Sequence, residues 1–175
     1  MTSFTIAIHA DIIKRMEENN RLLNSPALLA AVRRAFPDAA ARDARQLNAL
    51  VLAYIGDTVY DLFVRSYLVE ISDSTVRGLH LQSASLVCAC AQAEAFRRWE
   101  PLLTEEEMGI YKRGRNAHMG TVPKNASIAD YRVATGLEAL AGYLYLTGRD
   151  ARLAELMRLS LPQKHEKEDK QNGPN

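Results

Sequence analysis

The chain has 175 residues, of which 47% are hydrophobic and 25% are charged. These proportions are those of an ordinary globular protein, and they exclude a wholly disordered chain, a collagen-like repeat and a small disulfide-stapled scaffold. The 22 Lys and Arg residues almost balance the 21 Asp and Glu residues, for a net charge of +1. The total charge therefore indicates neither a nucleic-acid partner nor an acidic one, and any basic surface must come from local segregation of charge.

The distribution of apolar residues predicts an all-α fold with about seven helices. Long stretches lack both glycine and proline, and their apolar residues recur at helical rather than alternating spacing. Thr104 followed by Glu107, and Ser127 followed by Asp130, are signatures of helix starts. In chain order, the expected helices cover residues 11–23, 26–36, 47–69, 74–99, 105–113, 127–147 and 151–159.

Nothing in the sequence predicts export or insertion into a membrane. The first ten residues lack a basic leader, and the longest apolar stretch, 137–147, is interrupted by Glu138 and is much shorter than the ~20 residues that a membrane helix needs. Cys88 and Cys90 would lie on different sides of one helix, too close in sequence for an unstrained disulfide. We therefore expect both cysteines to be reduced and buried, and the protein to be cytoplasmic.

The first unusual residue is Asp57, a carboxylate within the otherwise apolar and aromatic stretch 53–61. It follows Gly56, and a glycine inside a helix costs about 1 kcal/mol relative to alanine. A carboxylate among apolar side chains loses hydration unless a partner restores it, and a cation would do so. Asp61, one turn further on, shares the face of Asp57. Asp57 is therefore either a site residue or a paired acid of the core.

Glu138 repeats this pattern in the second small and apolar helix. Two isolated acids on two apolar helices suggest a shared site of oxygen ligands, because Mg²⁺ prefers hard ligands and often uses one or two carboxylates together with water. The alternative is a glutamate that simply faces solvent.

Charge is segregated between residues 112 and 124, which contain four Lys or Arg residues and no Asp or Glu. The glycines of this segment permit close backbone approach, and its basic and amide side chains suit the phosphates and 2′-hydroxyls of double-stranded RNA. A solvated basic loop is the alternative. The candidate RNA-binding residues are Lys112, Arg113, Arg115, Asn116, His118 and Lys124.

Taken together, residues 46–60, 112–125 and 131–146 closely resemble the Mini-ribonuclease III family, and the resemblance covers residues 43–157. It implies a compact helical ribonuclease III-type endonuclease domain without a separate double-stranded-RNA-binding domain. It further implies a homodimeric, Mg²⁺-dependent nuclease that cuts double-stranded RNA during maturation of 23S precursor ribosomal RNA and leaves 5′-phosphate and 3′-hydroxyl ends.

The resemblance also implies roles for individual residues. Asp57 matches the aspartate of the ribonuclease III signature and Glu138 the glutamate of the second acidic motif, so both are expected to be catalytic and to bind the metal. Full-length ribonuclease III carries two further acids where this chain has Ala53 and Thr135. The coordination sphere is therefore leaner, and Asp61 is a hypothetical additional ligand.

The expected organisation is an N-terminal helical extension over residues 1–40, a catalytic domain over 43–159 and a disordered polar tail over 160–175. The alternative function, from a different class, is a non-catalytic helical module that binds RNA or the ribosome through the basic segment. Such a module would bind without cleaving in any divalent ion.

Overall fold

The computed structural model describes residues 28–38, 42–118 and 127–161, and within these ranges it contains seven α-helices and no strand. The predicted all-α fold is confirmed. The chain divides into two compact units, residues 1–40 and 41–175, and α2 (Leu28–Ala35) belongs to the first. The predicted helix over residues 11–23 lies outside the described residues.

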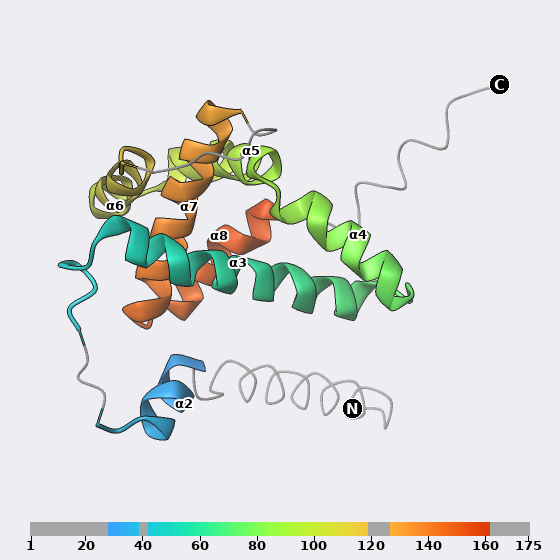
Figure 1. The fold of residues 1–175 in the computed structure, drawn as a ribbon, viewed down its shortest axis with the longest axis horizontal. Helices are drawn as coiled ribbons and strands as arrows, with labels where there is room; N and C mark the ends of the chain where they lie inside the picture. The colour runs from blue at the N-terminus through green and yellow to red at the C-terminus, as the bar shows by residue number, and fades with distance from the viewer. Residues whose placement is uncertain (1–27, 39–41, 119–126, 162–175) are drawn as a thin grey trace, which may run out of the picture. The chain divides into compact units, whose positions relative to one another are not determined.

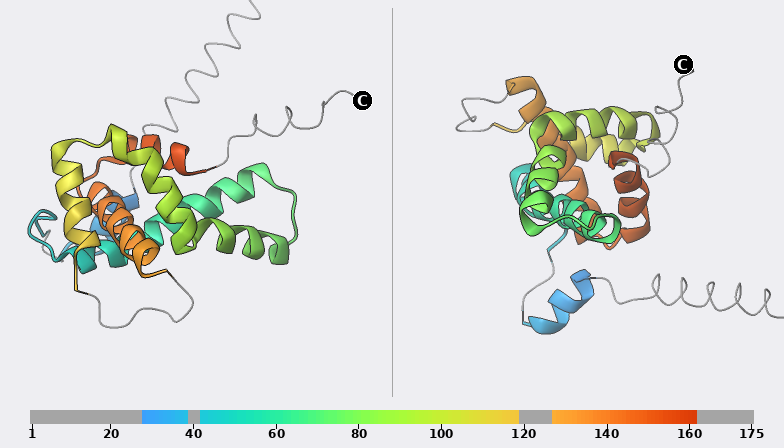
Figure 2. Two further views of the ribbon diagram at one scale, coloured as in Figure 1. Left: turned by 90° about the horizontal axis from the view of Figure 1, so that it is seen from above. Right: turned by 90° about the vertical axis from the view of Figure 1, so that its right-hand side faces the viewer.

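The second unit is built around one central helix, α7 (Figures 1 and 2). Leu137, Leu140 and Leu144 of this helix are fully buried, and α7 packs against α3, α5, α6 and α8. None of the described helices is long and apolar enough to cross a membrane. In chain order, the elements are α3 (Ala49–Ile71), α4 (Val76–Val87), α5 (Ala89–Trp99), the 3₁₀ turn η1 (Glu100–Leu102), α6 (Glu105–Arg115), α7 (Ile128–Leu146) and α8 (Asp150–Ser160).

Side-chain caps define where the helices begin. The Asn48 side chain accepts a hydrogen bond from the backbone of Leu50 at the start of α3, over 2.8 Å. Thr104 and Glu107 form a reciprocal capping box at the start of α6, and Ser127 accepts from the backbone of Asp130 at the start of α7. The last two starts are those predicted from the sequence, because capping depends only on residues close together in the chain.

The single helix predicted for residues 74–99 is wrong, because the chain breaks at Cys88. This residue has extended backbone angles, φ −65° and ψ 154°, and lies between α4 and α5. The break allows α4 to pack along α3 while α5 packs against α7 and α8 (Figure 2). The expectation of buried cysteines on different sides of a helix is also wrong: Cys90 is exposed, Cys88 is half-buried, and their sulfur atoms lie 2.7 Å apart.

The helix predicted to end at residue 159 continues to Ser160, and the packed core includes Leu161. Ser160 is buried and its hydroxyl accepts a 2.9 Å hydrogen bond from the indole nitrogen of Trp99, which is itself fully buried. This bond fixes the end of α8 to the end of α5. The rest of the tail predicted for 160–175 lies outside the described residues.

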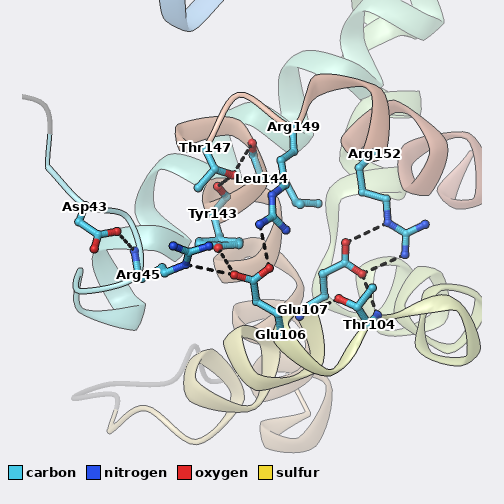
Figure 3. A network of polar contacts seen from close by, with 10 residues as sticks. All are labelled: Asp43, Arg45, Thr104, Glu106, Glu107, Tyr143, Leu144, Thr147, Arg149 and Arg152. Atoms are coloured by element: carbon cyan, nitrogen blue, oxygen red, sulfur yellow. Dashed lines mark hydrogen bonds and ion pairs between the residues drawn. The ribbon is translucent and has the colours of Figure 1, made fainter.

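A polar network joins α6 to α7, to α8 and to the segment that leads into α3 (Figure 3). The Glu106 carboxylate accepts from the Tyr143 hydroxyl at 2.7 Å, from Arg149 at 2.8 Å and from Arg45 at 3.2 Å. The neighbouring Glu107, 2% exposed, accepts two hydrogen bonds of 2.9 Å from Arg152. These two glutamates tie together segments that are distant in the sequence.

Candidate active site

The site lies where α3 crosses α7, and the two helices approach there through glycines. A Cβ added to Gly56 would overlap the backbone carbonyl of Glu138, and one added to Gly142 would overlap the carbonyl of Leu52. The glycine inside α3 is therefore required by the close approach of a second helix backbone. The contact places the turn of α3 that carries Asp57 directly against the turn of α7 that carries Glu138.

Asp57 and Glu138 are thus brought together, as the sequence predicted for a shared site. Glu138 is half-buried, and its pKa is raised to about 7 by burial first and by the negative charge of Asp57 second. The side chain of Asp57 is more exposed than its apolar neighbours suggested, and its pKa is raised by partial burial and by the charge of Asp61. Each of these acids makes ionisation of its neighbour less favourable.

Asp61 lies one turn beyond Asp57 and is half-buried. Its Oδ2 atom accepts a 2.7 Å hydrogen bond from Arg65, whereas its Oδ1 atom is buried and has no hydrogen-bond partner among the described residues. One oxygen atom of Asp61 is therefore already engaged in an ion pair and the other is unused.

The donor set of the pair fits Mg²⁺. The described residues contain no group of three or more His, Cys, Asp and Glu side chains that could hold a metal ion. Mg²⁺, however, is commonly held by one or two carboxylates together with water and substrate phosphates. Two neighbouring carboxylates whose pKa values are both raised are an arrangement that a divalent cation stabilises. The Thr135 hydroxyl, one turn before Glu138 on α7, donates a 3.0 Å hydrogen bond to the backbone carbonyl of Tyr131.

Gln92 of α5 is a residue of this site that the sequence analysis missed. It is 1% exposed, and its side-chain amide acts on Glu138, favouring the charged form and so opposing the rise in its pKa. In the sequence, Gln92 is one of several good helix formers in an alanine-rich stretch. No local pattern relates it to Glu138, because the two residues meet only through the packing of α5 against α7.

The basic segment begins within α6, which continues two residues beyond the predicted end at residue 113. Lys112, Arg113 and Arg115 belong to the last turn of α6, and Asn116 caps it. A Cβ on Gly114 would come within 3 Å of Gly136 and Ala139, so α6 and α7 are in close contact beside the turn that carries Glu138.

The candidate RNA-binding residues differ in their surroundings. The Arg113 guanidinium donates to the backbone carbonyls of Arg45 and Leu47, at 2.9 and 2.6 Å, and so holds the segment that enters α3. This structural role was not predicted. Lys112, Arg115, Asn116 and His118 are exposed, whereas Lys124 lies outside the described residues.

Comparison with known proteins defines the class and then the family. A ribonuclease III domain matches residues 50–149. The Mini-ribonuclease 3 of Clostridium tetani is 49% identical over 119 residues, which cover 67% of this chain and 79% of that protein. The Mini-ribonuclease 3 of Enterococcus faecalis is 48% identical over 118 residues, which cover 66% of this chain and 89% of that protein.

The crystal structure of a Fusobacterium nucleatum protein superposes with a TM-score of 0.62 at 27% identity, covering 67% of this chain and 94% of that one. The fold and the matched domain define a ribonuclease III-type endoribonuclease. Within that class, the chain belongs to the Mini-ribonuclease 3 family, and the resemblance stated from the sequence is confirmed.

Proposed function

We propose that this protein is a homodimeric, Mg²⁺-dependent endoribonuclease that hydrolyses double-stranded RNA in the cytoplasm, during maturation of 23S precursor ribosomal RNA. The observation that carries the proposal is the meeting of Asp57 and Glu138 at the crossing of α3 and α7. Membership of the Mini-ribonuclease 3 family supports the nuclease activity. The resemblance to that family described in the sequence analysis supports double-stranded RNA as the substrate.

Asp57 and Glu138 are the residues that would hold Mg²⁺. When bound there, Mg²⁺ would supply a water molecule of lowered pKa and would offset negative charge at the phosphodiester. Glu138 is the more buried ligand and fixes the position of the site, while the exposed Asp57 faces the solvent from which RNA approaches. Hydrolysis adds the oxygen of water to phosphorus and releases the 3′ oxygen, which takes up a proton, so that the product carries a 5′-phosphate.

The exposed end of α6 is the proposed surface for the RNA backbone. Lys112, Arg115, Asn116 and His118 lie there without an acidic side chain among them, and the three glutamates of α6 are at its opposite end. Such a surface recognises a duplex by its phosphates and shape and not by its bases. Lys124 remains a predicted member of this surface.

The apolar side of α3 supports the proposed homodimer. Leu50, Val51, Tyr54 and Leu62 are exposed and share one side of the helix, and Tyr54 is 81% exposed. Asp57 lies at the border of this surface, so a second copy packed there would bring a second pair of acids to the other strand of a duplex.

The oligomeric state tests the second copy directly. Light scattering should give the mass of two chains for the wild type and of one chain for Tyr54→Lys. Val76→Lys is the matched control, because Val76 is also an exposed apolar residue (70% exposed) but lies on α4 and outside this surface. This variant should remain dimeric. A monomeric wild type, or a dimeric Tyr54→Lys variant, contradicts the homodimer.

Single-turnover cleavage of a defined RNA duplex tests the activity. The wild type should cleave in Mg²⁺ and leave 5′-phosphate ends, whereas Asp57→Asn and Glu138→Gln should be folded and lose at least ~100-fold in rate. Glu70→Gln, at an exposed glutamate near the end of α3, should cleave normally. RNA binding without cleavage in any divalent ion would instead identify the non-catalytic binding module.

A further inference from the structure

Gln92 has a feature that its packing alone does not explain. It lies in the first turn of α5 and its backbone N–H donates to the Cys88 carbonyl at 3.0 Å, which fixes its place in the helix. The side chain is 1% exposed, yet its amide nitrogen Nε2 makes no hydrogen bond to any described residue. A buried donor without a partner is destabilising, and a methionine would fill the same space without that cost.

The acceptor to which Nε2 can donate a hydrogen bond is the carboxylate of Glu138. The packing of α5 against α7 brings the buried Gln92 side chain beside this carboxylate, and an amide N–H group is a donor that a carboxylate oxygen accepts. A cationic residue at this place would compete with a metal ion for the carboxylate, and an acidic residue would repel it. Glutamine does neither, so it suits a carboxylate that must remain available to a cation.

We propose that Gln92 is a positioning residue, which donates a hydrogen bond from Nε2 to the Glu138 carboxylate and holds it in the orientation that binds the metal. This inference rests on the proposed metal-dependent activity. Ligating carboxylates are commonly held by such hydrogen bonds, and losing one costs roughly 10–100-fold in metal affinity or activity.

The variant Gln92→Met removes the donor and keeps the length of the side chain. Its unfolding temperature should be no lower than that of the wild type, because the buried unpartnered donor is removed. Its RNA affinity in Ca²⁺ should match that of the wild type. Its single-turnover rate should fall about 10–100-fold, and the Mg²⁺ concentration for half-maximal rate should rise. The matched control is Gln82→Met on α4, which removes a side chain that donates to the Ser74 hydroxyl. It should change neither the single-turnover rate nor the Mg²⁺ concentration for half-maximal rate.

A second measurement uses the wild type and no RNA. In protein labelled with ¹⁵N at glutamine side chains, the Gln92 amide resonance should shift as Mg²⁺ is added, and the Gln82 resonance should not. The proposal is overturned if the Gln92 resonance does not respond, or if a folded Gln92→Met variant cleaves with the rate and Mg²⁺ dependence of the wild type. A wild type that does not cleave in Mg²⁺ refutes the proposed function itself, which is a separate result.

Cys88 and Cys90 carry a second, independent inference. Their Sγ atoms lie 2.7 Å apart, because Cys88 is extended at the junction of α4 and α5 while Cys90 is in the first turn of α5. Cys90 is exposed and therefore open to small reagents. Two free thiols held in contact, one of them exposed, are arranged for thiol–disulfide exchange. The hydrogen bond with Cys88 raises the pKa of the Cys90 thiol, so exchange should be slow at neutral pH and faster as the pH rises.

We infer that this pair is an oxidation site that forms a strained intrachain disulfide by exchange with a low-molecular-weight disulfide, since the contact of the two sulfur atoms overcomes the short spacing in the sequence. The Cys90 thiolate attacks the reagent and releases one thiol, and the Cys88 thiolate then attacks the Cys90 sulfur and releases the second. Two protein thiols and one disulfide thus become one protein disulfide and two small thiols.

Glutathione disulfide is the probe for this site. After incubation of the native protein, intact-mass spectrometry should show the loss of two hydrogen atoms, located by peptide mapping to residues 88–90. Cys88→Ser should instead retain one glutathione on Cys90. A wild type that keeps a glutathione on Cys90, or that forms only intermolecular disulfides, overturns the inference.

Discussion

Gly56 of α3 lies directly against the backbone carbonyl of Glu138 in α7, with no space for a side chain between the two helices. The same contact that packs the centre of the fold therefore also sets the separation of the two candidate catalytic acids. Packing and chemistry cannot be changed independently at this point.

Gly56→Ala is expected to be strongly destabilising, because its Cβ would force the helices apart; we expect a loss of about 3 kcal/mol or more in the free energy of unfolding. Gly109→Ala is the matched control, since nothing lies within 4 Å of the added Cβ in α6, and it should be stabilising by up to about 1 kcal/mol. Urea denaturation of the three proteins measures both effects. Equal stabilities of Gly56→Ala and the wild type would contradict the close approach.

The stability of the metal-free protein should depend on pH through Glu138. Its pKa is about 7 in the folded state and near 4.5 when unfolded, so between these values the folded state binds more protons. Its contribution is therefore complete below about pH 4.5 and is lost as the pH rises through 7.

Glu138→Gln removes this titration. In EDTA, the free energy of unfolding of the variant relative to that of the wild type should be about 2 kcal/mol higher at pH 7.5 than at pH 4.5. This amount allows for the partial exposure of the Glu138 side chain. Urea denaturation at the two pH values gives the difference. If the wild type and the variant respond to pH in parallel, Glu138 is not the group that titrates.

Glu106 should act in the opposite direction. Its pKa is lowered to about 2 by the hydrogen bond from the Tyr143 hydroxyl first, and then by those from Arg149 and Arg45. The stabilisation is present above pH 4.5 and is lost as the pH falls toward 2. Thermal unfolding at pH 7 should show a lower Tm for Glu106→Gln and no change for Glu105→Gln, at the exposed glutamate beside it, and the difference should narrow toward pH 3.

The starts of α6 and α7 could be predicted from the sequence because a cap needs only residues three positions apart. The acids Asp57 and Glu138 could be identified because each interrupts an apolar helix. The break at Cys88 could not, since it depends on which helices α4 and α5 pack against and not on local propensity.

Contacts between distant segments account for the remaining differences. The sequence shows that Gly56 lowers the helix propensity of its segment, but not that the backbone of α7 leaves no space for a side chain there. In the sequence, Gln92 is an ordinary helix former. Its relation to Glu138 exists only in the fold, where α5 packs against α7. Arg113 belongs to a basic cluster in the sequence, whereas in the fold its guanidinium is bound to two backbone carbonyls of the segment before α3.

Arg113 and Arg115 should consequently respond differently to the same substitution. Arg115→Ala removes an exposed charge at the end of α6, so RNA binding should weaken and the slope of log affinity against log salt should fall by about one unit, with unchanged stability. Arg113→Ala removes the two hydrogen bonds to Arg45 and Leu47, and the free energy of unfolding should fall by about 1–2 kcal/mol.

Binding of a short RNA duplex in Ca²⁺ at several salt concentrations, together with urea denaturation, separates the two effects. Leu47, whose carbonyl accepts from Arg113, directly precedes Asn48, which caps α3. The loss of Arg113 should therefore destabilise the start of the helix that carries Asp57. The assignment is refuted for Arg115 if its variant keeps the wild-type salt dependence. It is refuted for Arg113 if its variant is as stable as the wild type and loses only RNA affinity.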